Sequence, residues 1–471
     1  MKPQKLLLLF LFLLSVALRP SSALADHFAA GDMYLVYVGE APDGCTGTTK
    51  YTYILYYDIY KPCDSMNGAT LPTSLQVQYR SQTAVDAGLP GATNNVTLNL
   101  VKQDTVDQLC DVFKKENSCY SVRMDKPKGY DRVMLASIPF DLPYAMPDWT
   151  FWWWSCCTSN NLNNVPWYKD MYIEIMINNQ VKYNNSTPQY MIPPTPYICA
   201  NFPTTFLNGP FDLNNDSMRT YNIVHYTHMS PTAPPTWLTF TPPYTLQDPV
   251  GSSAANPFRV DSLTGAATFT PLQQGRYTLD FQTDEYDRKT GIRTAYIRRL
   301  CEINVFPCDV PPPQVDTMPS SITLSGGTIV NETIITCPGN NVKFEIKGKA
   351  NDNNSKIYLE ASPATIPGSA FTVPSTGPNA QGSTEPIGTF TWTPTVNDYG
   401  DHSITIISKD STCSGVGTMI VQKNYTVVKI KVIKGLDAGP DQPVCRINPV
   451  DKQLYVYGAE DLSGVKWMDI S

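Results

Sequence analysis

Apolar and polar side chains alternate along much of this chain. Residues 52–60 (TYILYYDIY) and 171–177 (MYIEIMI) are rich in β-branched and aromatic residues and have no helical period. Residues 425–433 alternate between the two faces of an extended chain. The pattern predicts strands throughout, with one or two helical turns at most, at residues 107–115.

Two segments of the chain repeat one another. Each begins at a cysteine, Cys199 or Cys337, with a phenylalanine seven residues later and an Asn/Asp turn fifteen residues later. Further on, residues 265–271 (GAATFTP) match residues 388–394 (GTFTWTP), and an alternating strand follows in both segments. Units of this length and pattern fit Ig-like or cadherin-like β-sandwiches.

Proline clusters divide the chain into domains. Residues 191–196 (MIPPTP) and 310–313 (VPPP) are stiff and poor in backbone donors, which suits linkers. The predicted organisation is a signal peptide (1–25), an N-terminal disulfide-rich β domain (26–195), two sandwiches (196–308 and 314–434) and a short tail (435–471). The predicted fold class is all-β, with tandem Ig-like or cadherin-like sandwiches after an N-terminal β-rich domain.

Composition agrees with an all-β chain. Of the 471 residues, 40 are proline, 11% are aromatic and only 16% are charged. A chain this aromatic is not disordered, and one this rich in proline is not a helical bundle. Many short strands joined by proline-containing turns fit best.

The N-terminus predicts export. Lys2 and Lys5 precede an apolar run at residues 6–18, and Ala23-x-Ala25 supplies a cleavage signature. The alternative, an uncleaved anchor, would also keep the protein outside the cytosol. No later run approaches the ~18 apolar residues of a membrane span. We therefore expect a protein that is secreted or held on the outer cell surface, with no membrane span after signal removal.

Charge argues against nucleic acid as a partner. The chain has a net charge of −7, and losing the three basic residues of the signal peptide leaves −10. Nucleic-acid binding requires a basic face.

The twelve cysteines all follow the signal peptide, so disulfides are expected in an oxidising compartment. The alternative, a metal site, would call for C-x2-C spacing, which the chain lacks. Proximity suggests the pairs Cys110–Cys119, Cys337–Cys413, and Cys199 with Cys301 or Cys308. Cys445 has no partner nearby in the sequence, so we expect the protein to continue beyond Ser471.

Residues 149–154 (WTFWWW) allow two interpretations. Tryptophans stacked on the surface would bind sugar rings. The favoured alternative is a strand buried in a sandwich core, because tryptophan is usually largely buried.

Catalytic motifs are missing from the sequence. His225 and His228 form an H-x-x-H in a strand-like segment, whereas a zinc protease needs H-E-x-x-H on a helix. No G-x-S-x-G motif or phosphate-binding loop is present. A glycosidase needs two carboxylates close together. The acidic residues Asp284, Glu285 and Asp287 could supply such a pair, but so could any acidic turn. We expect no enzymatic activity.

An oxygen-rich turn in the first repeat is the best candidate site. Asp212, Asn214 and Asp216 occupy alternate positions, and Asp284 and Glu285 end a strand of the same unit. Hard oxygen ligands of this kind suit Ca²⁺, although Asn and Asp also favour solvated turns without an ion. We therefore expect no cofactor other than a weakly bound Ca²⁺.

Several segments resemble large secreted surface proteins of Bacteroidetes, the gliding-motility-associated or PKD-domain-containing proteins. The resemblance is carried by residues 31–39 (GDMYLVYVG), 53–63 (YILYYDIYKPC), 196–201 (PYICAN) and 437–445 (DAGPDQPVC). It implies type IX secretion, a cadherin-like acidic turn at residues 211–217, and the start of a truncated PKD-type repeat in the tail.

Two functions follow from the resemblance and the missing motifs. The first is a non-catalytic adhesin or matrix protein for surface attachment or gliding, which binds an extracellular polysaccharide or a surface protein. The alternative is the accessory binding region of a secreted polysaccharide-degrading enzyme.

Overall fold

The chain is all-β, as the alternation predicts. The computed structural model describes residues 28–433, with gaps at 43–48, 64–70, 107, 111–112, 114–115, 117, 120–128, 160, 167–169, 225, 228–235, 316–323, 351–354, 362–365 and 411–419, and residues 436–437 and 443–444. In this part of the chain, α2 (Gln82–Asp86) is the one α-helix, and none is long and apolar enough to cross a membrane. The predicted signal peptide and most of the tail lie outside the described residues.

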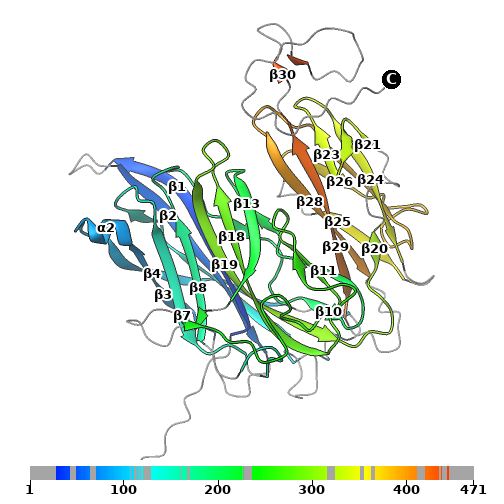
Figure 1. Cartoon of the computed structure of the whole chain (residues 1–471), viewed down its shortest axis with the longest axis horizontal. Coiled ribbons are helices and arrows are strands. Elements are labelled where there is room, and N and C mark those ends of the chain that lie inside the picture. The colour runs from blue at the N-terminus through cyan, green and yellow to red at the C-terminus, as the bar shows by residue number, and fades with distance from the viewer. Residues whose placement is uncertain are drawn as a thin grey trace, which may run out of the picture.

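The N-terminal strands form a closed ring. In spatial order its strands are β1 (Ala30–Pro42), β2 (Thr49–Pro62), β5 (Tyr130–Ser137), β4 (Thr93–Val106), β3 (Ser74–Ser81), β7 (Trp149–Cys156), β8 (Asp170–Ile177) and β19 (Arg293–Phe306). Every neighbouring pair is antiparallel, and β1 pairs with β19 to close the ring (Figure 1). Short β6 (Phe140–Leu142) adds to β2. Inward-facing aromatic and aliphatic side chains, such as Tyr57, Leu135 and Trp149, fill the ring.

The first sandwich shares β19 with this ring. One of its sheets contains β13 (Ser217–Ile223), β18 (Gly275–Tyr286) and β19, with β10 (Tyr197–Cys199) parallel to the end of β19. The other contains β11 (Thr204–Leu207), β17 (Ala266–Phe269) and β16 (Arg259–Val260). Phe206, Phe269 and Phe281 pack between the two sheets.

The second sandwich consists of two five-stranded sheets. The first contains β20 (Gln314–Val315), β21 (Leu324–Ser325), β24 (Val342–Lys349), β27 (Ile387–Trp392) and β26 (Ala370–Thr372). The other contains β22 (Thr328–Val330), β23 (Thr333–Thr336), β29 (Gln422–Val432), β28 (Gly400–Asp410) and β25 (Ile357–Ala361). Phe344 and Phe390 from the first sheet pack against Ile404 and Ile430 from the second.

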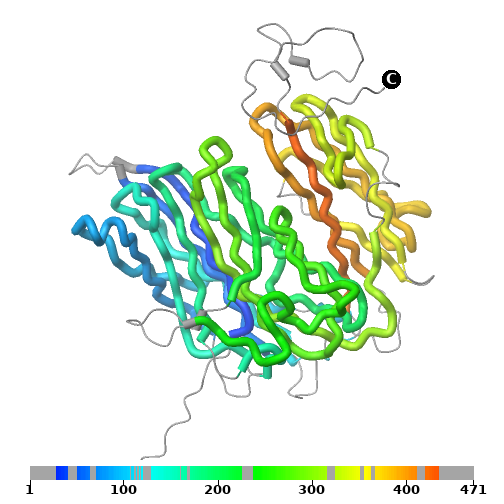
Figure 2. Tube along the Cα trace, viewed as in Figure 1, coloured from blue at the N-terminus to red at the C-terminus, as the bar shows by residue number. Residues whose placement is uncertain are grey.

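The sequence repeat is also a repeat of topology. Strands β10, β11, β13, β16, β17, β18 and β19 of the first sandwich correspond to β23, β24, β25, β26, β27, β28 and β29 of the second. In both units the last strand pairs with a parallel strand on one side and an antiparallel strand on the other. The chain trace in Figure 2 shows the second unit, in yellow and orange, beside the first, in green.

The predicted boundary between residues 195 and 196 does not separate two sheets. Strand β19 pairs with β8 at residues 295–297, with β1 at 299–300 and with β10 at 304–306. The ring is therefore completed by a strand that lies within the predicted second domain. Proline clusters mark where a chain turns, but they do not reveal which strands pair afterwards.

Three further strand pairs are short. They are β9 (Gln189–Tyr190) with β12 (Pro210–Phe211), β14 (Tyr226–Thr227) with β15 (Thr236–Trp237), and β30 (Leu436–Asp437) with β31 (Pro443–Val444).

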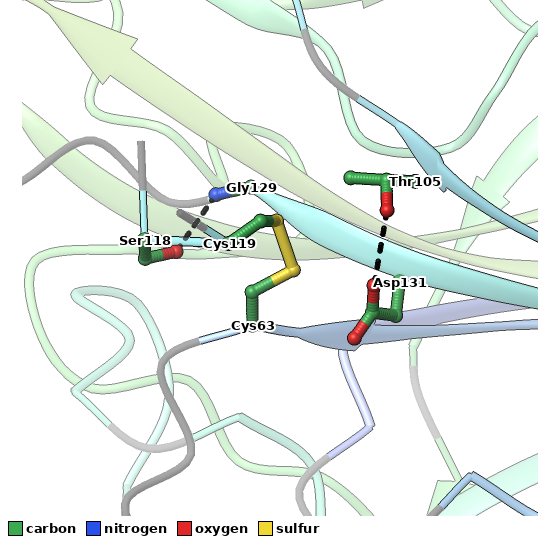
Figure 3. Close-up of a disulfide and its surroundings, with 6 residues drawn as sticks. All are labelled: Cys63, Thr105, Ser118, Cys119, Gly129 and Asp131. Carbon is green, nitrogen blue, oxygen red and sulfur yellow. Dashed lines mark hydrogen bonds between the residues drawn. A yellow bond between two sulfur atoms is a disulfide. The ribbon is translucent and has the colours of Figure 1, made fainter. Parts of the chain in front are cut away.

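The disulfides differ in part from those predicted by proximity. Cys119 is bonded to Cys63, with the two Cα atoms 4.7 Å apart, and Cys110 is bonded elsewhere, so the predicted Cys110–Cys119 pair is wrong (Figure 3). Cys63 directly follows β2, and its amide N donates to the carbonyl O of Gly129, just before β5 (2.9 Å). The Gly129 amide N in turn donates to Ser118 Oγ (3.0 Å), which places the neighbouring Cys119 beside Cys63.

Of the two partners left open for Cys199, the structure uses Cys308 and leaves Cys301 as a buried thiol. Cys337 is in a disulfide, but Cys413 lies outside the described residues, so that pair stays a prediction. The neighbouring Cys156 and Cys157 are bonded to one another.

Candidate functional site

The acidic turn lies between β12 and β13, at one end of the first sandwich. The Asp216 amide N donates to Asp212 Oδ2 (2.7 Å), and the Ser186 amide N donates to Asn214 Oδ1 (2.8 Å). The turn is thus held by hydrogen bonds of the kind that Asn and Asp side chains make with nearby backbone.

A lysine supplies positive charge to this turn. Lys182 Nζ lies 2.6 Å from Asp216 Oδ2, and the Asp216 side chain is buried. Lys182 belongs to the segment between β8 and β9, which crosses the end of the first sandwich. Part of the charge that a cation would balance is therefore already balanced by the protein.

Glu285 lies under the turn, fully buried at the end of β18. Its Oε1 accepts hydrogen bonds from Asn185 Nδ2 and Thr294 Oγ1, both 2.5 Å long. Three buried oxygens of the cluster, Glu285 Oε2, Asn185 Oδ1 and Asp212 Oδ1, have no hydrogen-bond partner among the described residues. Buried oxygens without a partner are uncommon and point to a missing proton, water or ion.

Burial and then the negative charge of Asp212 raise the pKa of Glu285 well above its usual range. Burial likewise raises the pKa of Asp212, against the lowering effect of its hydrogen bond from Asp216. The cluster can reduce its charge in two ways, by keeping a proton on Glu285 or by holding a cation between the unpartnered oxygens. Asp212, Asp216 and Glu285 do not form a set with carboxylate oxygens all within 4.8 Å of one another. Ca²⁺ binding here stays a prediction.

Asp284, the fifth residue predicted for this site, lies on the opposite face of β18. It accepts hydrogen bonds from Tyr221 OH (2.5 Å) and Gln282 Nε2 (2.8 Å). Its Oδ1 lies 3.7 Å from Arg293 NH1. The reason is the two-residue period of a strand, which sends Asp284 and Glu285 to different faces. Among the predicted residues, Asp212, Asn214, Asp216 and Glu285 are brought together.

Sequence reasoning missed Asn185 and Lys182, because both come from a segment far from the turn in sequence. The only local signal is the polar run at residues 182–187 (KYNNST).

The outer face of the sheet around Asp284 carries a network of aromatic and hydrogen-bonding side chains. Glu174 accepts hydrogen bonds from Tyr172 OH and Tyr296 OH, both 2.5 Å long. Its Oε1 also lies 3.8 Å from Arg298 NH2. Arg298 Nε in turn donates to Gln282 Oε1 (3.1 Å). The network therefore connects β8, β19 and β18 without a break.

This network is extended by one residue on each side. Trp152 on β7 is directly opposite Glu174 on β8, and Tyr221 on β13 is directly opposite Gln282 on β18. Gln282 Nε2 donates to Tyr221 OH (2.9 Å). We call the residues Trp152, Glu174, Arg298, Gln282 and Tyr221 the cross-strand row. Within it Tyr221 is 37% exposed and Trp152 is half-buried, whereas the side chains of Arg298 and Glu174 are only 12% and 15% exposed and Gln282 is buried.

The favoured interpretation of the tryptophan run, a strand buried in the core, is confirmed for alternate residues. Trp149 is fully buried in the ring, and Trp153 packs edge-on against Phe28 and Tyr57, with ring centroids 5.6 and 5.5 Å apart. Trp152 and Trp154 are half-buried residues on the other face of β7. The run is therefore a core strand on one side and part of an outer aromatic surface on the other.

The histidine pair predicted to be unremarkable, His225 and His228, lies outside the described residues. His402 is a packing residue, with Nε2 2.7 Å from the Asp398 carbonyl O and its ring edge-on to Trp392.

No family model and no curated protein matches this sequence. A sialic-acid-binding region of a Streptococcus sanguinis adhesin is similar in structure, at 12% identity over 53% of this chain and 78% of that one, with a TM-score of 0.16. Mouse cadherin-23 repeats EC22–24 are similar at 11% identity over 72% of this chain and 90% of that one, with a TM-score of 0.17.

An endo-fucoidan hydrolase of glycoside hydrolase family 107 is similar at 10% identity, over 71% of this chain and 39% of that one, with a TM-score of 0.16. At these TM-scores the likenesses add nothing to the argument from the site. The resemblance to Bacteroidetes surface proteins likewise stays a prediction.

Proposed function

We propose that this chain is a non-catalytic, adhesin-like extracellular protein that binds polysaccharide on the outer face of β7, β8, β19, β18 and β13. The cross-strand row carries this proposal. It combines aromatic rings, on which sugar rings stack, with the carboxylate, guanidinium and amide groups that hydrogen-bond sugar hydroxyls.

The row is also held in place before any ligand binds. Glu174 is fixed by two tyrosine hydroxyls, and Arg298 Nε is fixed by Gln282. Side chains that are already ordered lose little conformational entropy on binding, which favours affinity. A polysaccharide fits this surface better than a protein partner, because the row is polar and the buried centre of a protein interface is depleted in charged residues.

The test is a glycan array followed by calorimetric titration of the exported full chain. Tyr221→Ala should weaken glycan binding about tenfold, the effect of losing about 1.4 kcal/mol. The matched control is Tyr183→Ala, because Tyr183 is 50% exposed and lies outside the row. Equal binding by both variants would reject the outer face as the site.

Catalysis is tested on the same glycans. We expect no bond cleavage by the full chain. Turnover that is abolished by Asp284→Ala would overturn the non-catalytic assignment.

A further inference from the structure

A cleft of about 580 Å³ separates the two sandwiches, which lie beside one another in Figure 1. One wall is the outer face of the β11–β17 sheet, with Thr205 and Thr268. The other is β29, with Asn424, Tyr425 and Thr426. Its volume lies within the ~300–1,000 Å³ of ordinary ligand pockets, which occur preferentially between domains.

Polar contacts hold the cleft at both ends. At one end Lys429 Nζ lies 2.6 Å from Asp261 Oδ2, and Arg288 NH1 donates to the Tyr399 carbonyl O (3.0 Å). At the other end Lys423 Nζ donates to Gln108 Oε1 (3.3 Å). The second sandwich is thus held to the first at one end of the cleft and to the segment after β4 of the N-terminal ring at the other, which favours a preformed space.

Comparison of the two repeats shows that one edge of β29, the edge facing away from β28, is largely unpaired among the described strands. In the first sandwich, the edge of β19 that faces away from β18 is occupied by β8, β1 and β10. In the second, β23 occupies the corresponding edge of β29 only at residues 429–432. No described strand pairs with residues 422–428 on that side. On this side the Tyr425 amide N donates to Asn424 Oδ1 (2.9 Å) instead of to a neighbouring strand.

The lining has the chemistry of a sugar site. It is rich in threonine hydroxyls and side-chain amides, with the Tyr425 ring among them and few apolar side chains. Asp261 is neutralised by Lys429, and the other acidic residue of the lining, Glu332, makes no ion pair within the part of the chain that the structure describes. A negative charge disfavours anionic ligands, and a polar wall offers little to an apolar peptide.

We propose that this cleft is a second carbohydrate site, which binds a short neutral oligosaccharide between the two sandwiches. The inference rests on the proposed function, since both sites would serve attachment to polysaccharide. It adds a binding mode in which the end or a short stretch of a glycan enters between two modules, whereas the outer face meets a glycan side-on.

The experiment is calorimetric titration of the full chain with maltotriose, cellotriose and laminaritriose, with 3'-sialyllactose as the anionic probe. Thr268→Arg places a long side chain in the cleft and should weaken binding of the neutral probe at least tenfold. Tyr425→Ala should weaken it as well, without adding bulk. Thr391→Arg is the matched control, because Thr391 is a half-buried threonine on β27 of the second sandwich and is not part of the cleft lining. Thermal melting checks that each variant is folded.

The outcomes separate the two sites. Loss of trisaccharide binding in Thr268→Arg and Tyr425→Ala, with Tyr221→Ala and Thr391→Arg unchanged, supports the cleft. Loss in Tyr221→Ala alone supports the outer face and overturns the cleft. Preference for 3'-sialyllactose, or no binding of any neutral trisaccharide by the unaltered chain, also overturns the cleft proposal. Binding of longer glycans that needs Tyr221 would still leave the proposed function standing.

Discussion

Replacing Arg299 with methionine should destabilise the ring and the first sandwich together. The Arg299 side chain is fully buried where β19 passes from one unit to the other, and its Nε and NH2 donate to the two carboxylate oxygens of Asp32 on β1, at 2.7 and 2.9 Å. Arg299 NH1 also donates to the Asn208 carbonyl O (2.9 Å), and the guanidinium lies 4.3 Å from the centroid of the Tyr190 ring.

The expected loss follows from what the variant leaves behind. Asp32 is 4% exposed, so its carboxylate would stay buried without a counter-charge. Removing one partner of a buried ion pair costs about 3–5 kcal/mol. For a cooperative unit of more than 250 residues, each kcal/mol corresponds to about 2 °C or less, so the melting temperature should fall by at most about 6–10 °C.

The loss should also depend on pH. Burial raises the pKa of Asp32, while Arg299 lowers it. Without Arg299 the pKa of Asp32 rises further, and a carboxyl with a raised folded-state pKa loses stability as pH rises through that pKa. The deficit of Arg299→Met should therefore be larger at pH 8 than at pH 5.

Differential scanning calorimetry at both pH values is the assay. Arg132→Met is the matched control, because Arg132 pairs with Asp58 at 3.0 Å on a more exposed part of the ring and should cost less. The double variant Asp32→Leu/Arg299→Met should lose less stability than Arg299→Met alone, since no buried charge remains. A loss below about 1 kcal/mol in Arg299→Met, or a double variant less stable than the single one, would refute the reasoning.

Three further predictions follow from the fold and the acidic turn. Residues 26–195 expressed alone should not fold, because they lack β19. The fragments 26–308 and 314–434 should each give protease-resistant protein that melts cooperatively. A folded 26–195 fragment would contradict the conclusion that the ring and the first sandwich share β19. The double variant Cys63→Ser/Cys119→Ser should have a free energy of unfolding about 4 kcal/mol lower, because the unfolded chain regains the entropy that a bond across a 56-residue separation removes. Denaturant titration measures this loss, and an unchanged midpoint would show that the disulfide adds no stability. In about 5 mM Ca²⁺ the free energy of unfolding of the full chain should be about 1–2 kcal/mol higher than in EDTA, and Glu285→Gln should abolish this increase. Equal melting temperatures in both buffers would mean that Lys182 and the turn hydrogen bonds stabilise the acidic turn without an ion.

The sequence predicted the class of structure and the internal repeat well, for a local reason. Side chains of a strand alternate with a period of two, so the pattern at residues 171–177 or 425–433 is sufficient to identify a strand. The repeat was visible because equivalent turns and glycines recur at the same spacing. The position of the turn Asp212–Asp216 was likewise correct.

Predictions that required long-range pairing were less successful. Proximity along the chain suggested Cys110–Cys119, but the hydrogen bonds of Cys63 and Ser118 with Gly129, just before β5, bring Cys63 to Cys119. The sequence could not decide between Asp284 and Glu285 as the neighbour of the turn, since only the pleat and register of β18 turn Glu285 toward it and Asp284 away from it. Asn185 and Lys182 reached the site from another segment and were missed.

What the sequence determined by itself is therefore the strand content, the repeat and the polar turns, each of which depends on residues that are neighbours along the chain. Only the tertiary structure decided that β19 belongs to two units, that the cross-strand row is continuous, and that the edge of β29 opens onto a cleft. The physical reason is that strand pairing is made by backbone groups common to nearly all residues. Which edge meets which is settled by packing and buried charge pairs, such as Arg299 with Asp32, between segments far apart in the chain.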